Sequence, residues 1–130
     1  MLVGMSAAGD PLTAMRFRVE IDGLKASDFF EVLFPEAVLE AGRERFTPMV
    51  VRRAASADRE LSDWWDQTAR GRPAPRTLSV ILLDARGHEQ IRLKFARARP
   101  VRYALSPLNA VDPALLMETI ELEVESFERG

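Results

Sequence analysis

Few side chains in this sequence are of the kinds that catalyse reactions or hold metals. The chain has one histidine, His88, and no cysteine. His88 directly follows Gly87 in a segment with the composition of a turn, where we expect a solvent-exposed histidine. Without a second histidine or any thiol, the chain offers no histidine pair or thiolate to a metal ion and no thiol nucleophile. A disulfide framework is excluded for the same reason.

Two carboxylates, Asp63 and Asp66, flank the adjacent tryptophans Trp64 and Trp65. Carboxyl groups at this spacing can act as a general acid and a general base, but on a helix they more often belong to a solvated face. No serine stands in a G-x-S-x-G sequence, and neither the G-x-G-x-x-G nor the P-loop pattern occurs. We therefore expect no enzymatic activity, no metal and no cofactor.

Charged residues gather in two further places. One group is basic and includes an interleaved aromatic residue, Phe46, so it is either a solvated face or a contact for an anionic partner. The other is a row of glutamates, which is costly unless water or cations oppose the like charges. Arg92 and Lys94 are one set of cations that could oppose the row. The basic group is Arg43, Arg45, Arg52 and Arg53, and the acidic row is Glu121, Glu123 and Glu125.

Length and composition are those of one soluble domain spanning residues 1–130. Hydrophobic residues make up 47% and charged residues 29% of the chain, and no apolar run approaches the roughly 20 residues of a membrane-spanning helix. The 18 basic and 20 acidic side chains argue against a dedicated nucleic-acid-binding protein. Residues 1–10 lack the basic start and long apolar stretch of a secretory signal, and we expect them to be a flexible lead-in.

The clearest structural pattern is a long β-hairpin at Arg76–Tyr103, in which Val101 and Tyr103 extend the returning strand past Pro100. Residues 78–83 form an apolar run, residues 84–87 read as a turn, and residues 90–95 alternate strictly between apolar and polar side chains. Gly87 suits the turn position with positive φ. Because Ile91, Leu93 and Phe95 share one face, that face must be covered by the rest of the chain.

Other segments predict further strands and one helix. Strands are expected at residues 15–21, 29–33, 49–53 and 119–127. Residues 36–45 are expected to be a partly ordered loop, in which Val38 and Leu39 could belong to a short strand or a helical turn and Gly42 would break either. A helix is expected from Ser56, as N-cap, to Gly71, with Leu61, Trp64, Trp65 and Thr68 in its buried stripe. Since two adjacent tryptophans cannot both face the core fully, one should pack on a sheet and the other lie at an edge or a subunit contact. This inventory predicts a mainly β fold of two packed antiparallel sheets, a sandwich or distorted barrel, with one α-helix.

The order and spacing of these pieces resemble a known family, the tail tube proteins of contractile phage tails and their relatives in extracellular contractile injection systems. The resemblance covers nearly the whole chain. The matching pieces are DPLTAMRFRVEIDGL (residues 10–24), FFEV (29–32), MVVRRAASADRELSDWW (49–65), SVILLDARGHEQIRLKFARARPVRY (79–103), LNA (108–110) and METIELEVESFER (117–129).

The resemblance implies a structural protein that forms hexameric rings, which stack into a hollow tube inside a contractile sheath. It implies sheath, baseplate and spike proteins as partners, DNA or protein cargo in the bore, and no membrane anchor. The tube would be assembled in the cytoplasm and belong to a virion or injection particle that can be released. Only about 16 residues separate Val32 from Met49, where family members carry a longer excursion, so a tube initiator or adaptor ring is an alternative. A secreted tube protein of the type VI kind is another.

Within that framework the charged groups acquire expected roles. The three glutamates of the acidic row are candidates for the lining of the bore, where negative charge would keep an anionic cargo from sticking. The basic group and the two tryptophans are candidates for contacts between subunits or rings. The lumen candidates are Glu121, Glu123 and Glu125, and the contact candidates are Arg43, Arg45, Arg52, Arg53, Trp64 and Trp65.

Overall fold

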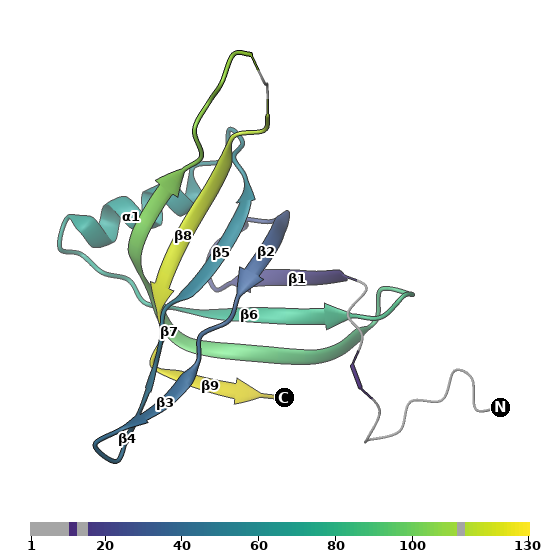
Figure 1. Cartoon of the computed structure of the whole chain (residues 1–130), viewed down its shortest axis with the longest axis vertical. Helices are drawn as coiled ribbons and strands as arrows, with labels where there is room; N and C mark the ends of the chain where they lie inside the picture. Colours follow the sequence, from purple (N-terminus) through teal and green to yellow (C-terminus); the bar gives the residue numbers. More distant parts are fainter. Residues whose placement is uncertain (1–10, 13–15, 112–113) are drawn as a thin grey trace.

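The computed structural model describes residues 11–12, 16–111 and 114–130, so the expected lead-in at residues 1–10 lies outside the described part. That part contains nine strands and one helix, whose arrangement can be followed in Figure 1. Their order is β1 (Arg16–Ile21), β2 (Phe29–Leu33), β3 (Ala37–Glu40), β4 (Arg43–Phe46), β5 (Met49–Ala54), α1 (Glu60–Ala69), β6 (Arg76–Leu83), β7 (Glu89–Leu105), β8 (Met117–Glu123) and β9 (Ser126–Arg129).

The hairpin of β6 and β7 is present as the sequence predicts. The two strands pair antiparallel with Leu78 opposite Phe95, and Gly87 has a φ of 84° in the turn. The Asp84 carboxylate accepts hydrogen bonds from the backbone N–H groups of Arg86 and His88, which stabilises the turn. Pairing with β6 ends at Ala98, so the prediction that the hairpin continues to Tyr103 is wrong beyond that residue.

Strand β7 is long because it serves two sheets. Its first half pairs with β6 and β9, and its second half pairs with β8. Arg97, with a φ of 54°, lies where the pairing changes, and β7 curves there from the horizontal into the vertical strands of Figure 1. The first sheet is therefore β1-β6-β7-β9 and the second is β7-β8-β5-β2. The predicted pair of antiparallel sheets is confirmed, with open edges rather than a closed barrel.

The core lies between the two sheets and α1. Apolar side chains from alternate positions of β5, β6 and β8 meet Leu61 and Trp64 of the helix. Trp64 is 2% exposed, and its indole N–H donates to the Ala74 carbonyl at 2.9 Å. Trp65 is only half-buried, as expected for the second of two adjacent tryptophans.

Two local boundaries differ from the sequence prediction. The helix begins at Glu60 rather than after Ser56, because the Asp58 carboxylate accepts from the Glu60 N–H while Ser56 accepts from the Asp58 N–H. The C-terminal segment is two strands rather than one. The chain leaves the second sheet after Glu123, the Glu125 N–H donates to the Ala96 carbonyl, and β9 then joins the first sheet.

Residues 36–45, for which the sequence predicts a partly ordered loop, are largely a β-hairpin. Strands β3 and β4 pair with Glu40 opposite Arg43, and Ala41 and Gly42 between them have φ values of 53° and 77°. Two consecutive positive φ values are the geometry of a type I′ turn, whose twist matches that of the flanking strands. The hairpin projects from the lower end of the molecule in Figure 1.

Candidate assembly surfaces

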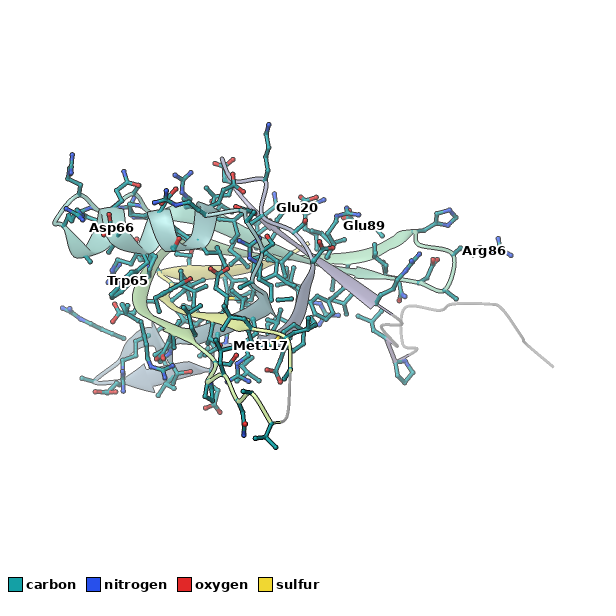
Figure 2. The ribbon with its side chains drawn as sticks, turned by 90° about the horizontal axis from the view of Figure 1, so that it is seen from above. Glu20, Trp65, Asp66, Arg86, Glu89 and Met117 are labelled. Carbon is teal, nitrogen blue, oxygen red and sulfur yellow. The ribbon has the colours of Figure 1, made fainter. Side chains whose placement is uncertain are left out.

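Within the described part of the chain, no helix or strand covers one face of the second sheet, which we call the open face. Along β8, Ile120 and Leu122 are buried against the core that contains α1, and the alternating residues point the other way. Seen from above in Figure 2, α1 with Trp65 and Asp66 lies along one side of the molecule, while Met117 lies on the other. The open face carries Glu31, Leu33, Val50, Arg52, Arg99, Arg102, Ala104, Thr119, Glu121 and Glu123.

The charges of the open face are paired across neighbouring strands. Three ion pairs link arginines to glutamates, so three positive and three negative side chains cancel. The face is consequently neutral, and the glutamates do not make it the negative surface that the sequence suggested. The pairs are Arg52–Glu31 at 2.5 Å, Arg99–Glu123 at 2.6 Å and Arg102–Glu121 at 3.8 Å. Glu125, beyond the end of β8, pairs with Arg97 at 3.0 Å.

The predicted opponents of the acidic row, Arg92 and Lys94, lie on the other sheet. Arg92 instead bridges Glu20 and Glu89, at 3.0 Å from each, on the first sheet. Figure 2 shows Glu20 and Glu89 close together. The hydrogen bond from Arg92 holds the pKa of the Glu20 carboxyl below its usual range. The prediction failed because alternation along a strand identifies a face without identifying the strand beside it.

The second sheet has two edges with unpaired backbone groups. Among the residues that the structure describes, one edge is β2, which pairs only with β5, and the other is the second half of β7, which pairs only with β8. Both edges expose large apolar side chains, Phe30 and Leu33 on β2 and Val101 and Leu105 on β7. Such edges are templates for a further strand.

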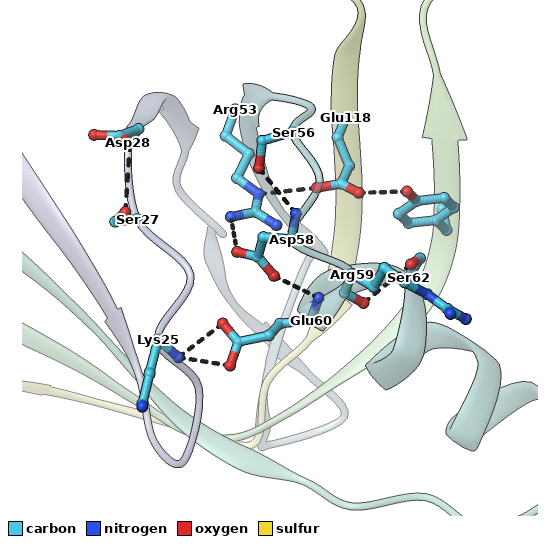
Figure 3. A network of polar contacts seen from close by, with 11 residues as sticks. Lys25, Ser27, Asp28, Arg53, Ser56, Asp58, Arg59, Glu60, Ser62 and Glu118 are labelled. Atoms are coloured by element: carbon cyan, nitrogen blue, oxygen red, sulfur yellow. Dashed lines mark hydrogen bonds and ion pairs between the residues drawn. The ribbon is translucent and has the colours of Figure 1, made fainter.

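Arg53, a predicted contact residue, lies in the interior instead. It is 2% exposed and binds Glu118 and Asp58, at 2.9 Å each, while Tyr103 donates its hydroxyl to Glu118 (Figure 3). Burial opposes the charge of Arg53, but the hydrogen bonds to Asp58 and Glu118 raise its pKa overall. Burial and the bond to Glu118 raise the pKa of Tyr103. This network ties β5, β7 and β8 to the start of α1.

The remaining contact candidates have different environments. Arg43 is exposed on β4, and Arg45 pairs with Glu40 on the same hairpin. Arg52 lies on the open face, where it binds Glu31 and donates to the Thr119 hydroxyl. Among the tryptophans, Trp64 is enclosed by the core, so only Trp65 presents surface to a neighbour.

The structure also shows surface features that charge patterns could not indicate. Phe34 and Phe127 are about half exposed beside Phe95, and Leu108 and Val111 stand out from the loop between β7 and β8. The sequence signal that could have indicated these exposed apolar side chains is their position next to prolines, since Phe34 precedes Pro35 and Leu108 follows Pro107.

The residues considered for chemistry lie on the surface beside residues of opposite charge. Asp63 and Asp66 pair with Arg59 and Arg70 on the exposed side of α1, as the solvated-face interpretation predicts. His88 is exposed beside Asp84. Among the residues that the structure describes, no cluster of three metal-ligating side chains occurs, and no helix is long and apolar enough to cross a membrane.

Comparison with known proteins identifies the family. The model of the T4-like virus tail tube protein gp19 family matches residues 36–128. The chain belongs to this family. It is thus a structural protein of the tail tube type, which confirms the resemblance seen in the sequence. A search of curated proteins found no match.

Solved structures show that the tail tube fold extends over nearly the whole chain. A chain in the sheath–tube complex of an extracellular contractile injection system (PVC) has a TM-score of 0.77 at 14% identity, covering 95% of this chain and 93% of that one. A chain of the anti-feeding prophage baseplate has a TM-score of 0.67 at 18% identity, covering 97% of each. Hcp1 from Flavobacterium johnsoniae has a TM-score of 0.65 at 17% identity, covering 88% and 94%.

Proposed function

We propose that six copies of this tail tube protein join through the two edges of the second sheet and close into a ring. The observation that carries the proposal is the pair of apolar edges, β2 on one side and the second half of β7 on the other. In such a ring, β2 of one subunit continues the sheet beside β7 of the next, so each subunit satisfies the open edges of its neighbours.

The open face then lines the bore. Four strands from each of six subunits make 24 strands, and a spacing of about 4.8 Å between strands gives a circumference of about 115 Å. A cylinder of this circumference is about 37 Å across between opposite strand backbones before strand tilt widens it. The side chains of the open face narrow the bore inside this cylinder and still leave room for an extended or helical cargo. Glu121 and Glu123 line this bore as expected from the sequence, and Glu125 lies near its rim. Their arginine partners make the wall neutral, so it attracts neither a cationic nor an anionic cargo strongly.

The rings stack into the inner tube of a contractile phage tail or injection system. The similar chain in the PVC sheath–tube complex supports sheath and tube partners, and the one in the anti-feeding prophage baseplate supports a baseplate partner. Arg43 and Arg45 on the projecting β3–β4 hairpin and the half-buried Trp65 on α1 are the contact candidates that remain on the surface. The particle is assembled in the cytoplasm and carries DNA or protein in its bore.

One observation favours an initiator or adaptor ring as a second function. The β3–β4 hairpin is short, with four residues in each strand and two in the turn, so it offers little reach to subunits in other rings. An adaptor that joins the tube to the baseplate or spike needs such contacts on one side only. We expect the purified protein to form long tubes if it is the main tube subunit, and to stop at one or two stacked rings if it is an adaptor.

Disruption of one sheet edge tests ring closure. Leu33→Lys places a charge at the β2 edge, and Gln67→Lys places the same charge on the exposed side of α1. By native mass measurement we expect the parent and Gln67→Lys proteins to reach six times the 14.6 kDa of one chain, and Leu33→Lys to remain a monomer. Hexamers of Leu33→Lys with the stability of the parent would overturn the edge-to-edge ring.

A further inference from the structure

An apolar groove lies at the lower part of the molecule, beside β9. Its aromatic wall is formed by Phe34, Phe95 and Phe127, whose rings are 6.0 Å apart for Phe34–Phe95 and 5.2 Å apart for Phe95–Phe127. Its volume is about 270 Å³. Phe127 is 44% exposed, so the groove opens to the surface. The remaining lining residues are Pro35, Ala37, Phe46 and Leu93.

An apolar loop segment lies at the other end of the molecule. Residues 106–111, SPLNAV, contain no charged side chain, and Leu108 and Val111 are 75% and 92% exposed. The Asn109 side chain accepts a hydrogen bond from the Val111 N–H at 2.9 Å, so the segment is ordered by its own turn. Two large apolar side chains this exposed are left uncovered by the other described residues of their own chain.

The positions of the two features decide which molecule can bring them together. Figure 1 places the start of the β7–β8 loop at the top of the long axis and β3, β4 and β9 at its lower end. A chain therefore cannot place its own loop in its own groove. Neighbours within a ring lie at the same height, and the strands of the second sheet run along this axis, so the copy within reach is one in the adjacent ring.

We propose that residues 106–111 of each subunit dock, through Leu108, into the Phe34–Phe95–Phe127 groove of a subunit in the next ring. This inference rests on the proposed ring and adds the contact that stacks one ring on another. It is a head-to-tail contact between different surfaces, which repeats without closing and so extends a tube.

Size and charge both fit this occupant. A cavity of roughly 150 Å³ holds one benzene molecule, so the groove has room for a leucine side chain and part of its neighbours. The loop segment brings no charged side chain into the groove. The projecting tip of the β3–β4 hairpin fits less well as an occupant, because it would bring Glu40 and Arg43 into an apolar site. Six such contacts form between each pair of rings, so a modest loss at each one is multiplied across the interface.

Cysteine cross-linking tests the contact directly, because the natural chain has no cysteine. A double variant, Leu108→Cys with Phe127→Cys, is assembled into tubes and treated with diamide, which accepts the two hydrogens released when the thiols form a disulfide. We expect a ladder of dimers and longer multimers on a denaturing gel, reversed by reductant, with each single variant as a control. Tubes visible by electron microscopy that yield no more cross-links than the single variants would overturn the inference.

A charge at the loop separates ring stacking from ring formation. We expect Leu108→Asp to retain the mass of a hexamer. The protein concentration needed for tubes to appear should rise at least tenfold relative to the parent. Leu12→Asp, at an exposed leucine outside the loop and groove, should stack like the parent. Equal losses in both variants, or tubes of Leu108→Asp like those of the parent, would contradict the docking. A parent protein that forms no rings would overturn the proposed function and, with it, this inference.

Discussion

The buried network around Arg53 should be the most sensitive polar site in the fold, and Glu118→Gln is the change that probes it. Glu118 is 4% exposed and accepts from both Arg53, at 2.9 Å, and Tyr103. The glutamine keeps the length and shape of the side chain while removing its negative charge. Arg53 then retains only Asp58 as a counter-ion.

The expected cost follows from the burial of the arginine. Removal of one partner of a buried ion pair destabilises proteins by about 3–5 kcal/mol, because the remaining charge lacks its compensation. Since Asp58 still binds Arg53, we expect about 3 kcal/mol, the lower end of that range. A chain of this length has a total stability of about 7–20 kcal/mol. The loss corresponds to a fall of roughly 10 °C in Tm.

Thermal and denaturant unfolding of the monomer measure this loss, with Glu123→Gln as the matched control on the same strand. Glu123 binds Arg99 at 2.6 Å in partial contact with water, and exposed pairs contribute about 0–1 kcal/mol. The double variant Arg53→Met with Glu118→Leu should recover much of the loss, because both charges are removed together. If Glu118→Gln unfolds no more easily than Glu123→Gln, the network does not carry the stability assigned to it.

Three further outcomes are expected. The hydrogen bond from Arg53 holds the pKa of Asp58 below its usual value, so the stabilising contribution of the Asp58 carboxylate is present above about pH 4 and is lost as the pH falls through the folded-state pKa. Asp58→Asn should therefore flatten the fall in Tm between pH 5 and 3, and an unchanged slope would contradict this. Trp64→Ala should cost about 3–5 kcal/mol by chemical denaturation and Trp65→Ala clearly less, because only Trp64 is fully enclosed; equal losses would refute the assignment. Gly42→Val should destabilise the β3–β4 turn by about 1–2 kcal/mol, seen as faster amide exchange on that hairpin, since Gly42 has a φ of 77°; unaltered exchange would count against the turn geometry.

Much of the local structure could be predicted because its causes are local. Alternation of Ile91, Leu93 and Phe95 with polar residues requires a strand with one buried face, whatever lies beyond it. The same reasoning identified β1, β2, β5 and β8. It failed at Ala41–Gly42, where two short strands carry too little alternation to be distinguished from a loop. It also placed the helix start at Ser56, since Ser56 and Asp58 are both good capping residues by type.

The charged residues show which properties follow from the sequence and which follow only from the tertiary structure. Their alternation with apolar residues determined that Glu121 and Glu123 share one face of a strand. Only the tertiary structure decided that Arg99 and Arg102 lie opposite them, that the face is neutral, and that Arg53 is buried against Glu118, 65 positions away. Periodicity is a property of consecutive residues, whereas strand order, free edges and counter-ions depend on which distant segments pair. The sequence alone therefore determined most of the longer strands and the family resemblance, and the fold decided which surfaces remain for assembly.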